Sequence, residues 1–285
     1  ARDYAGLTRV LRSPLARAGG LTATLHWMAG LACIEQRQFA EGAEHMRQCL
    51  ALRHQPTLTP VDKNILNGGP YHCLARCQMA LSKPQDARYA FESALIEEPE
   101  SRSIRLDYAR FLAAEGQEVE ALQWLHALIA EDASDVQVWH LGGQVALSKP
   151  ELLEFAGDWT QEAMKCHGKQ SAIIEQRASA LLLSGQPEKA LPLWQSFNGK
   201  ATSSQRAATL ICEASLSPRL QAPETAAAGT IDREFVNWYR RLLDARAVGV
   251  IKTLNQRMEP LRPIVPGAVQ VLEKALAEVE VGLTE

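Results

Sequence analysis

The sequence predicts an all-α protein built as a solenoid of stacked helical pairs. The first observation is a self-similarity, because the segment Ala87–Leu95 superimposes on Ala121–Ile129 at a shift of 34 residues. A period of this length is typical of helix–turn–helix units that bury their apolar faces only by stacking on one another. Glycine and proline also punctuate the helical patterns, as in Gly185-Gln-Pro187. The apolar content of 46 % is enough for a continuous core.

The N-terminal end predicts a helical segment at residues 1–22 and a first unit at about 23–54. That unit is indicated by Gly30, Phe39, Gly42, Met46 and Cys49. Its first helix is apolar all round, as expected for a buried helix. We therefore expect the preceding segment, or a domain outside this chain, to cover it.

An insertion at about 53–69 interrupts the period between the first and second units. It contains Pro56, Pro60 and the run Asn67-Gly-Gly-Pro70, which are typical of turns. We expect a loop or a short extra helix at Val61–Leu66.

The second and third units have small residues where their two helices should cross and a bulky residue beside the crossing. With repeat position 1 at residue 68, the second unit's pattern consists of Tyr71, Leu74, Ala75, Ala87, Phe91, Ala94 and Pro99. With position 1 at residue 102, the third unit repeats it in Tyr108, Ala109, Ala121 and Leu125. Gly116 is expected to end the third unit's first helix.

The fourth unit, at about 136–168, is indicated by Trp139, Gly143, Phe155 and Trp159. Lys83-Pro84 and Lys149-Pro150 lie 66 residues apart, two fewer than twice the period. This spacing predicts an inter-helix turn about two residues short. The fifth unit contains Ala178, Ala190 and Trp194, with Pro187 opening its second helix.

The repeat array of about five units is thus expected at 23–200. Residues 201–229 predict a degenerate helix and a connector rich in proline and alanine. The segment 230–285 has apolar stripes that include Phe235, Trp238, Leu242 and Val271. We expect it to form C-terminal helices that cap the last open face of the array.

The pattern of the second, third and fifth units resembles the tetratricopeptide repeat (TPR) family over roughly 23–200. The resemblance implies a TPR-like solenoid and a protein-binding function. The insertion with Thr59–Leu66, the run Tyr71–Ala75 and the segment Glu234–Leu242 are also similar to the C-terminal TPR region of bacterial family 2 glycosyltransferases. No transferase Asp-x-Asp motif is present, so this likeness implies an appendage of an enzyme and carries no catalytic residue.

Composition argues against several classes of function. The net charge is −3, whereas nucleic-acid and anionic-membrane binders need a basic face. No apolar run approaches the ~20 residues of a membrane span. The six cysteines show no framework spacing, which favours reduced thiols and a cytoplasmic location.

No signature of an enzyme or of a cofactor site is present in the sequence. Phosphate-binding, nucleophile-elbow and zinc-protease motifs are all missing, so a small-molecule or nucleotide hydrolase is disfavoured. His72, Cys73 and Cys77 invite a metal site, but a fourth donor at suitable spacing is missing. Two small buried thiols packed between helices are the favoured interpretation.

The first helix of each unit should instead present a binding groove. The candidate groove residues are His72, Arg76, Asp107, Arg110, His140, Gln144 and Glu175. Arg76 and Arg110 share repeat position 9 in successive units, so their guanidinium groups could hold a carboxylate or an acidic peptide. An ordinary solvated face with Arg110–Asp107 pairing is the competing interpretation. The sequence therefore predicts a non-enzymatic scaffold with a protein or peptide partner, and the glycosyltransferase appendage is the alternative.

Overall fold

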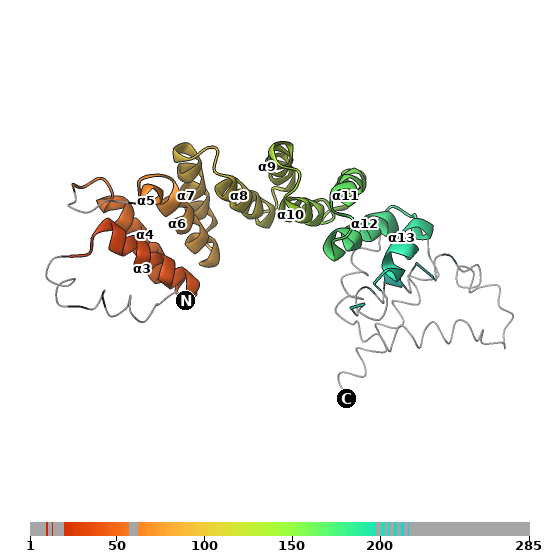
Figure 1. Ribbon diagram of the computed structural model, residues 1–285, viewed down its shortest axis with the longest axis horizontal. Coiled ribbons are helices and arrows are strands. Elements are labelled where there is room, and N and C mark those ends of the chain that lie inside the picture. The colour runs from red at the N-terminus through yellow and green to blue at the C-terminus, as the bar shows by residue number, and fades with distance from the viewer. Residues whose placement is uncertain are drawn as a thin grey trace, which may run out of the picture. The chain divides into compact units, whose positions relative to one another are not determined.

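The computed structural model describes residues 20–56 and 62–197, together with positions 10, 13, 201, 202, 205, 208, 209, 212, 213 and 216. Eleven α-helices and one 3-10 helix lie in these residues, which contain no strand (Figure 1). The predicted all-α, TPR-like helical-pair solenoid is confirmed. The expected cap at 230–285 lies outside the described residues, as do nearly all of the segments 1–22 and 201–229.

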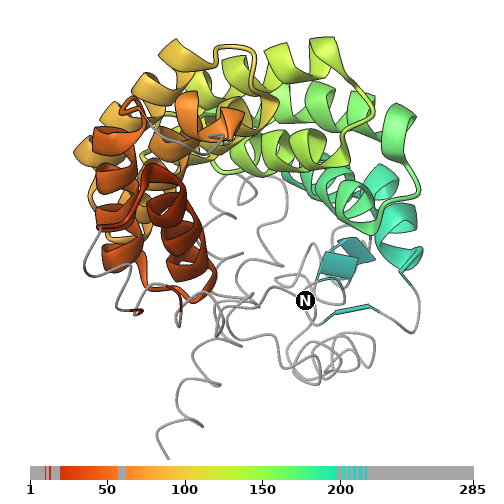
Figure 2. The same ribbon diagram turned by 60° about the vertical axis from the view of Figure 1, so that its left-hand side comes forward.

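The chain divides into two compact units, Ala1–Leu128 and Ile129–Glu285. The first unit has three helical pairs in its described part, with α3 packing on α4, α4 on α6 and α6 on α7 (Figure 2). Its helices are α3 (Ala23–Glu35), α4 (Phe39–Leu52), α5 (Lys63–Leu66), α6 (Gly69–Ala80), α7 (Pro84–Glu97), α8 (Arg102–Ala114) and α9 (Glu118–Glu131). The boundary between the units falls inside α9.

The second unit continues the alternation of first and second helices. Its elements are α10 (Val136–Ala146), the 3-10 helix η1 (Pro150–Leu152), α11 (Leu153–His167), α12 (Ser171–Leu183) and α13 (Pro187–Gln195). Helix α10 packs on α11, α11 on α12 and α12 on α13. Within this unit, successive helices thus pack against one another.

Small residues hold the two helices of each pair close together. Ala87 and Ala121 are fully buried, as the repeat register predicts. In the first pair the equivalent position is Gly42, which faces Gly30 across the crossing. A Cβ added to Gly30 would lie 2.5 Å from Met46 Cε, so the end of the buried Met46 side chain would have to move to admit it.

The insertion between the first and second pairs contains a short helix, α5, whose N-cap Asp62 accepts a hydrogen bond from the Asn64 amide. Arg53, only 8 % exposed, links the insertion to helix α7. Its guanidinium donates to Asn67 O at 2.9 Å and forms a two-point ion pair with Glu97 at the end of α7. The insertion is therefore tied to the second pair by a largely buried charge.

Four of the five pairs share one three-residue turn between their helices. In the third pair Gly116 has φ +75°, its N–H donates to Ala113 O, and the Gln117 N–H donates to Leu112 O. This is a Schellman motif, in which a left-handed residue lets the last carbonyls of a helix be satisfied. The left-handed residue is Arg37, Ser82 or Gly185 in the other three pairs.

The fourth pair differs, and the expected two-residue shortening of its turn is wrong. Helix α10 ends at Ala146 and α11 begins at Leu153, so residues 147–152 connect them. Pro150 opens a 3-10 helix there, whereas Pro84 opens α7 directly. Helix α10 has 11 residues where α8 has 13, so the deficit lies in the first helix and the connection is longer.

The longer connection shifts the second helix of the fourth pair by one residue. Helix α9 begins 34 residues after α7, but α11 begins 35 residues after α9. The buried positions that correspond to Ala121, Leu125 and Leu128 are therefore Ala156, Thr160 and Ala163. Trp159 packs beside them and donates from its indole Nε1 to Trp139 O at 2.9 Å.

Candidate functional site

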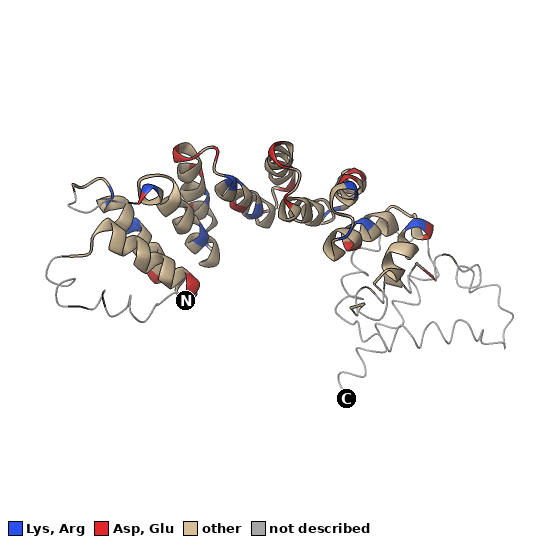
Figure 3. Cartoon of the chain, in the orientation of Figure 1, with Lys and Arg blue, Asp and Glu red and all other residues tan. Residues whose placement is uncertain are grey.

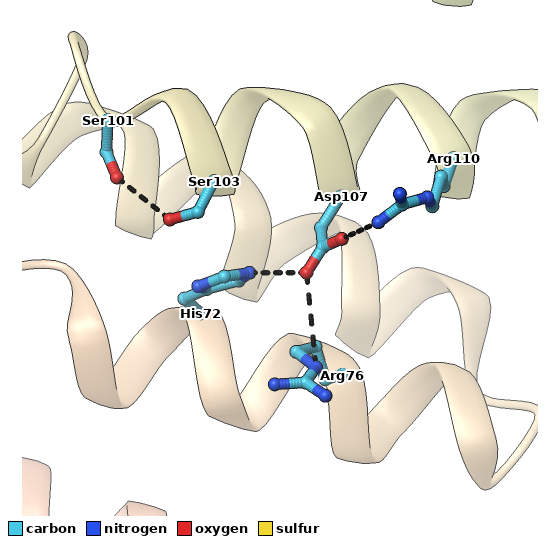
Figure 4. A network of polar contacts seen from close by, with 6 residues as sticks. All are labelled: His72, Arg76, Ser101, Ser103, Asp107 and Arg110. Carbon is cyan, nitrogen blue, oxygen red and sulfur yellow. Dashed lines mark hydrogen bonds and ion pairs between the residues drawn. The ribbon is translucent and has the colours of Figure 1, made fainter. Parts of the chain in front are cut away.

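Four of the predicted groove residues meet on the surface formed by α6 and α8, the first helices of the second and third pairs. His72 and Arg76 lie four residues apart on α6, so one helical face carries both. Asp107 and Arg110 lie three residues apart on α8, the next first helix. Figure 4 shows the four side chains gathered between the two helices, with Asp107 at the centre.

Asp107 is the shared partner of the other three side chains. Its Oδ2 is 2.9 Å from His72 Nε2, and its Oδ1 accepts from Arg110 Nη1 at 2.6 Å. The Arg76 Nε lies 4.0 Å from Oδ2, at the limit of an ion pair. The two arginines therefore converge, as their shared repeat position predicts, and an internal carboxylate lies between them.

The pKa of Asp107 is lowered from its ordinary value. Burial by itself would raise it, but the hydrogen bond and charge of His72 and those of Arg110 outweigh that effect. The carboxylate is therefore ionised at neutral pH. It compensates one of the two guanidinium charges.

The inner members of this network are covered and the outer members are open. The side chains of His72 and Asp107 are 14 % and 24 % exposed, whereas those of Arg76 and Arg110 are 50 % and 43 % exposed. His72 also packs against the buried Phe91, with ring centroids 6.1 Å apart. The terminal nitrogens of Arg76 point away from Asp107 in Figure 4. The surface thus presents guanidinium donors held by a fixed carboxylate.

The other three predicted residues lie in the second unit. The backbone carbonyl of His140 accepts from Gln176 Nε2 at 2.7 Å, so α10 and α12 are joined there by a side-chain amide. Glu175 accepts from Gln205 Nε2 at 3.0 Å. Gln144 is exposed. In this unit the corresponding helices are therefore linked mainly through neutral groups.

Cys73 and Cys77 are buried thiols rather than exposed ligands. Burial raises the pKa of Cys73 to about 12 and that of Cys77 to about 11, so both thiols stay protonated. Within the described part of the chain, no group of three or more His, Cys, Asp or Glu side chains is arranged to hold a metal ion.

Two features of the surface were not predicted from the sequence. One is a cavity of about 510 Å³ between α11, α12 and α13, lined by Gly157, Arg177 and Lys189 among others. The other is a pair of facing histidines, His26 and His45, in the first helical pair. No spacing pattern in the sequence signals this pair, because its two members lie 19 residues apart on opposite helices.

Charge and hydropathy of the described helices add two general observations. Lys and Arg occur together with Asp and Glu on the helices of both units (Figure 3). Among the described residues, none of the helices is both long enough and apolar enough to cross a bilayer.

Comparison with known proteins supports the repeat type over part of the chain. The family model described as tetratricopeptide repeat matches residues 74–145, which cover most of the second and third helical pairs and α10. None of the curated protein sequences compared with this chain matches it significantly.

Several solved structures share the fold. The C-terminal part of a TPR repeat-containing protein from Cytophaga hutchinsonii is 12 % identical, over 87 % of this chain and 92 % of that chain, with a TM-score of 0.58. PilF of Pseudomonas aeruginosa is 14 % identical, over 88 % and 97 %, with a TM-score of 0.55. A tetratricopeptide repeat protein from Parabacteroides merdae is 12 % identical, over 94 % and 90 %, with a TM-score of 0.54. At these identities the likeness establishes the fold alone.

Proposed function

We propose that this chain is a non-catalytic scaffold that binds an acidic peptide segment of a partner protein. The binding surface is the one that helices α6 and α8 present in the compact unit Ala1–Leu128. The observation that carries the proposal is the convergence of Arg76 and Arg110, from successive first helices, on Asp107. A TPR-like fold supports the coarser part, because stacked first helices form extended surfaces suited to protein partners.

Asp107 prepares this surface for an incoming carboxylate. Two exposed arginines without an anion would repel each other and sample many rotamers. His72 holds Asp107 at 2.9 Å, and Asp107 in turn orients Arg110. Binding a partner therefore costs less side-chain entropy, because Arg110 is already ordered in the free protein. The donors that Asp107 does not use are then available for a carboxylate of the partner.

The competing interpretation is that the same four side chains form a closed network that only stabilises the packing of α6 on α8. Both interpretations predict a contribution of Asp107 to stability. Only the binding interpretation predicts that the guanidinium groups matter for partner capture while folding is little affected.

The test is affinity capture from lysate with mass spectrometry, using the parent protein and Arg76→Ala/Arg110→Ala. The amount of the main partner that the double variant captures should fall by at least about tenfold, since each charge-assisted hydrogen bond contributes about 1 kcal/mol or more. Helicity and melting should stay close to those of the parent. Capture should also weaken as salt rises, because exposed charges are screened.

Arg47→Ala is the matched control. Arg47 lies on the second helix α4, pairs with Glu44 three residues away at 2.7 Å and is 47 % exposed, much like Arg110. The Arg47→Ala variant should capture the same partners, in the same amounts, as the parent protein does. Equal capture by the parent and the double variant would show that the arginines serve stability only.

The glycosyltransferase-appendage interpretation stays a prediction from sequence, since the comparisons add no support for it. In that case the same surface would position an acceptor or an assembly partner of the transferase. Sequencing the gene upstream of Ala1 tests it directly, because an in-frame transferase domain would be encoded there.

A further inference from the structure

The first helical pair brings two histidine rings into contact where the fourth pair brings two tryptophans together. His26 and His45 occupy repeat positions 4 and 23, with ring centroids 5.2 Å apart and planes tilted by 49°. Trp139 occupies position 4 of the fourth pair, and Trp159 corresponds to position 23 once the one-residue shift of α11 is counted; their ring centroids are also 5.2 Å apart. A packing position that accepts an aromatic pair is thus filled in the first pair by two titratable metal-ligand side chains.

The two imidazoles point the same kind of nitrogen at each other. The Nδ1 atom of His26 lies 3.0 Å from the Nδ1 atom of His45. In the absence of an ion, one Nδ1 must donate and the other accept. If both neutral rings carry their proton on Nε2 instead, both Nδ1 lone pairs face the space between α3 and α4.

This separation is close to that of two nitrogen ligands on one metal ion. Zinc binds imidazole nitrogen at about 2.0–2.1 Å in tetrahedral geometry, so two such ligands lie about 3.3 Å apart. Small changes in side-chain torsion therefore convert the pair from a hydrogen bond to a bidentate site. We infer that His26 and His45 bind a divalent transition-metal ion of the zinc type, with water completing its coordination.

The surroundings of His26 favour the neutral form of its ring, which is the form that binds such an ion. Burial lowers the pKa of His26, and His45 lowers it further, while the negative charge of Glu44 opposes them. Glu44 itself accepts from Arg47 and Gln48, which leaves the two imidazoles as the protein donors of the site.

Binding would have a structural consequence that differs from the proposed peptide binding. An ion held by α3 and α4 cross-links the two helices of the first pair and stabilises the folded state by mass action. The arginines of the candidate peptide site lie on α6 and α8, so the two sites can be tested separately.

The experiment is calorimetric titration of the metal-free protein with zinc chloride at pH 7.5, together with thermal melting. The parent should bind zinc and melt at a higher temperature in its presence. His26→Gln and His45→Gln, which keep a polar side chain, should each lower the affinity of this site by at least about tenfold, equivalent to 1.4 kcal/mol, and abolish the shift in melting temperature.

His126→Gln is the control, because His126 is an exposed histidine on α9. It should behave as the parent, and any zinc bound by the exposed Cys166 should be the same in all four proteins. Circular dichroism without metal establishes that each variant folds, and either histidine variant alone suffices for the comparison. Equal zinc affinity and equal melting shifts in the parent and a folded histidine variant would overturn the inference, as would a parent that binds no zinc.

Discussion

The fourth helical pair follows nearly the same period as the second and third pairs. It differs from them in the connection between its helices and in the residue beside the helix crossing. In the second and third pairs a three-residue turn joins the helices, and Phe91 or Leu125 fills the space beside the crossing. In the fourth pair a six-residue connection joins them, and Thr160 occupies that position. The repeat therefore tolerates a connection three residues longer, which displaces the second helix by one residue, provided that the neighbouring side chains repack.

The repacking in the fourth pair depends on glycine. Gly142 corresponds in position to Leu74 and Tyr108, and a Cβ added there would lie 2.0 Å from Trp159 Cζ2. The large indole and the absent side chain are thus complementary. The first-helix surfaces differ as well, since α6 and α8 carry a charged network and α10 and α12 are joined by a neutral amide.

The largest expected effect comes from Gly142→Ala. The new methyl group meets a buried tryptophan ring that is fixed by its hydrogen bond to Trp139 O, so we expect a loss of about 3 kcal/mol in the free energy of unfolding. Denaturant titration measures it. Gly157→Ala in α11 is the control, because its Cβ meets nothing within 4 Å, and it should stabilise by up to about 1 kcal/mol. Equal midpoints for the two variants would show that the fourth pair is not packed through Gly142.

A second test concerns the crossing of the third pair. Ala121→Leu should destabilise by about 1–3 kcal/mol, because Ala121 in α9 is fully buried at the small-residue position of the repeat. Ala127→Leu makes the same substitution at an exposed position of the same helix and should change stability by less than about 0.5 kcal/mol. Urea midpoints that do not separate the two variants would contradict the repeat register.

A smaller effect is expected at the left-handed turn residues of the three-residue turns. Ser82 has φ +55° and Gly116 has φ +75°. Ser82→Gly should stabilise by about 0.5–1 kcal/mol, and Gly116→Ala should destabilise by about 1 kcal/mol, since a Cβ is strained in this conformation. Thermal melts of the two variants should shift in opposite directions, and shifts of the same sign would argue against the shared turn geometry.

The smallest effect is the pH dependence of the charged network. The pKa of Asp107 is lower in the folded protein than its ordinary value, so its stabilising contribution is complete above that ordinary value, near pH 4. The contribution is lost as the pH falls through the folded-state pKa. The difference in unfolding free energy between the parent and Asp107→Asn should therefore be larger at pH 6 than at pH 3. A difference that is constant, or that grows on acidification, would rule out the ionised network.

Much of the fold follows from the sequence because the repeat signals are local and periodic. Ala87, Ala121 and Gly116 mark crossings and a turn by residue type alone. The turn at Ser82 carries no such mark, since a serine rarely adopts the left-handed conformation. The fourth turn was predicted wrongly because Lys149-Pro150 copies Lys83-Pro84 in sequence, while its proline begins a 3-10 helix instead of an α-helix.

The candidate site could be predicted only in part. Shared repeat positions predict that Arg76 and Arg110 lie close together, since successive first helices pack side by side. The role of Asp107 as their common partner depends on side-chain rotamers and on the fit of His72 against Phe91, which no spacing rule contains. His26 and His45 lie 19 residues apart and belong to opposite helices of one pair, so their contact follows only from the folded geometry.

The most direct test of the central claim is selection of peptides from a random displayed library on the immobilised protein. The account predicts that the parent enriches peptides rich in Asp and Glu, that Arg47→Ala enriches the same peptides, and that Arg76→Ala/Arg110→Ala does not. Fluorescence anisotropy of a selected peptide should then show binding to the parent that weakens with salt. Selected peptides without acidic enrichment, or the same acidic peptides selected by the double variant, would contradict the claim that this surface binds acidic partners.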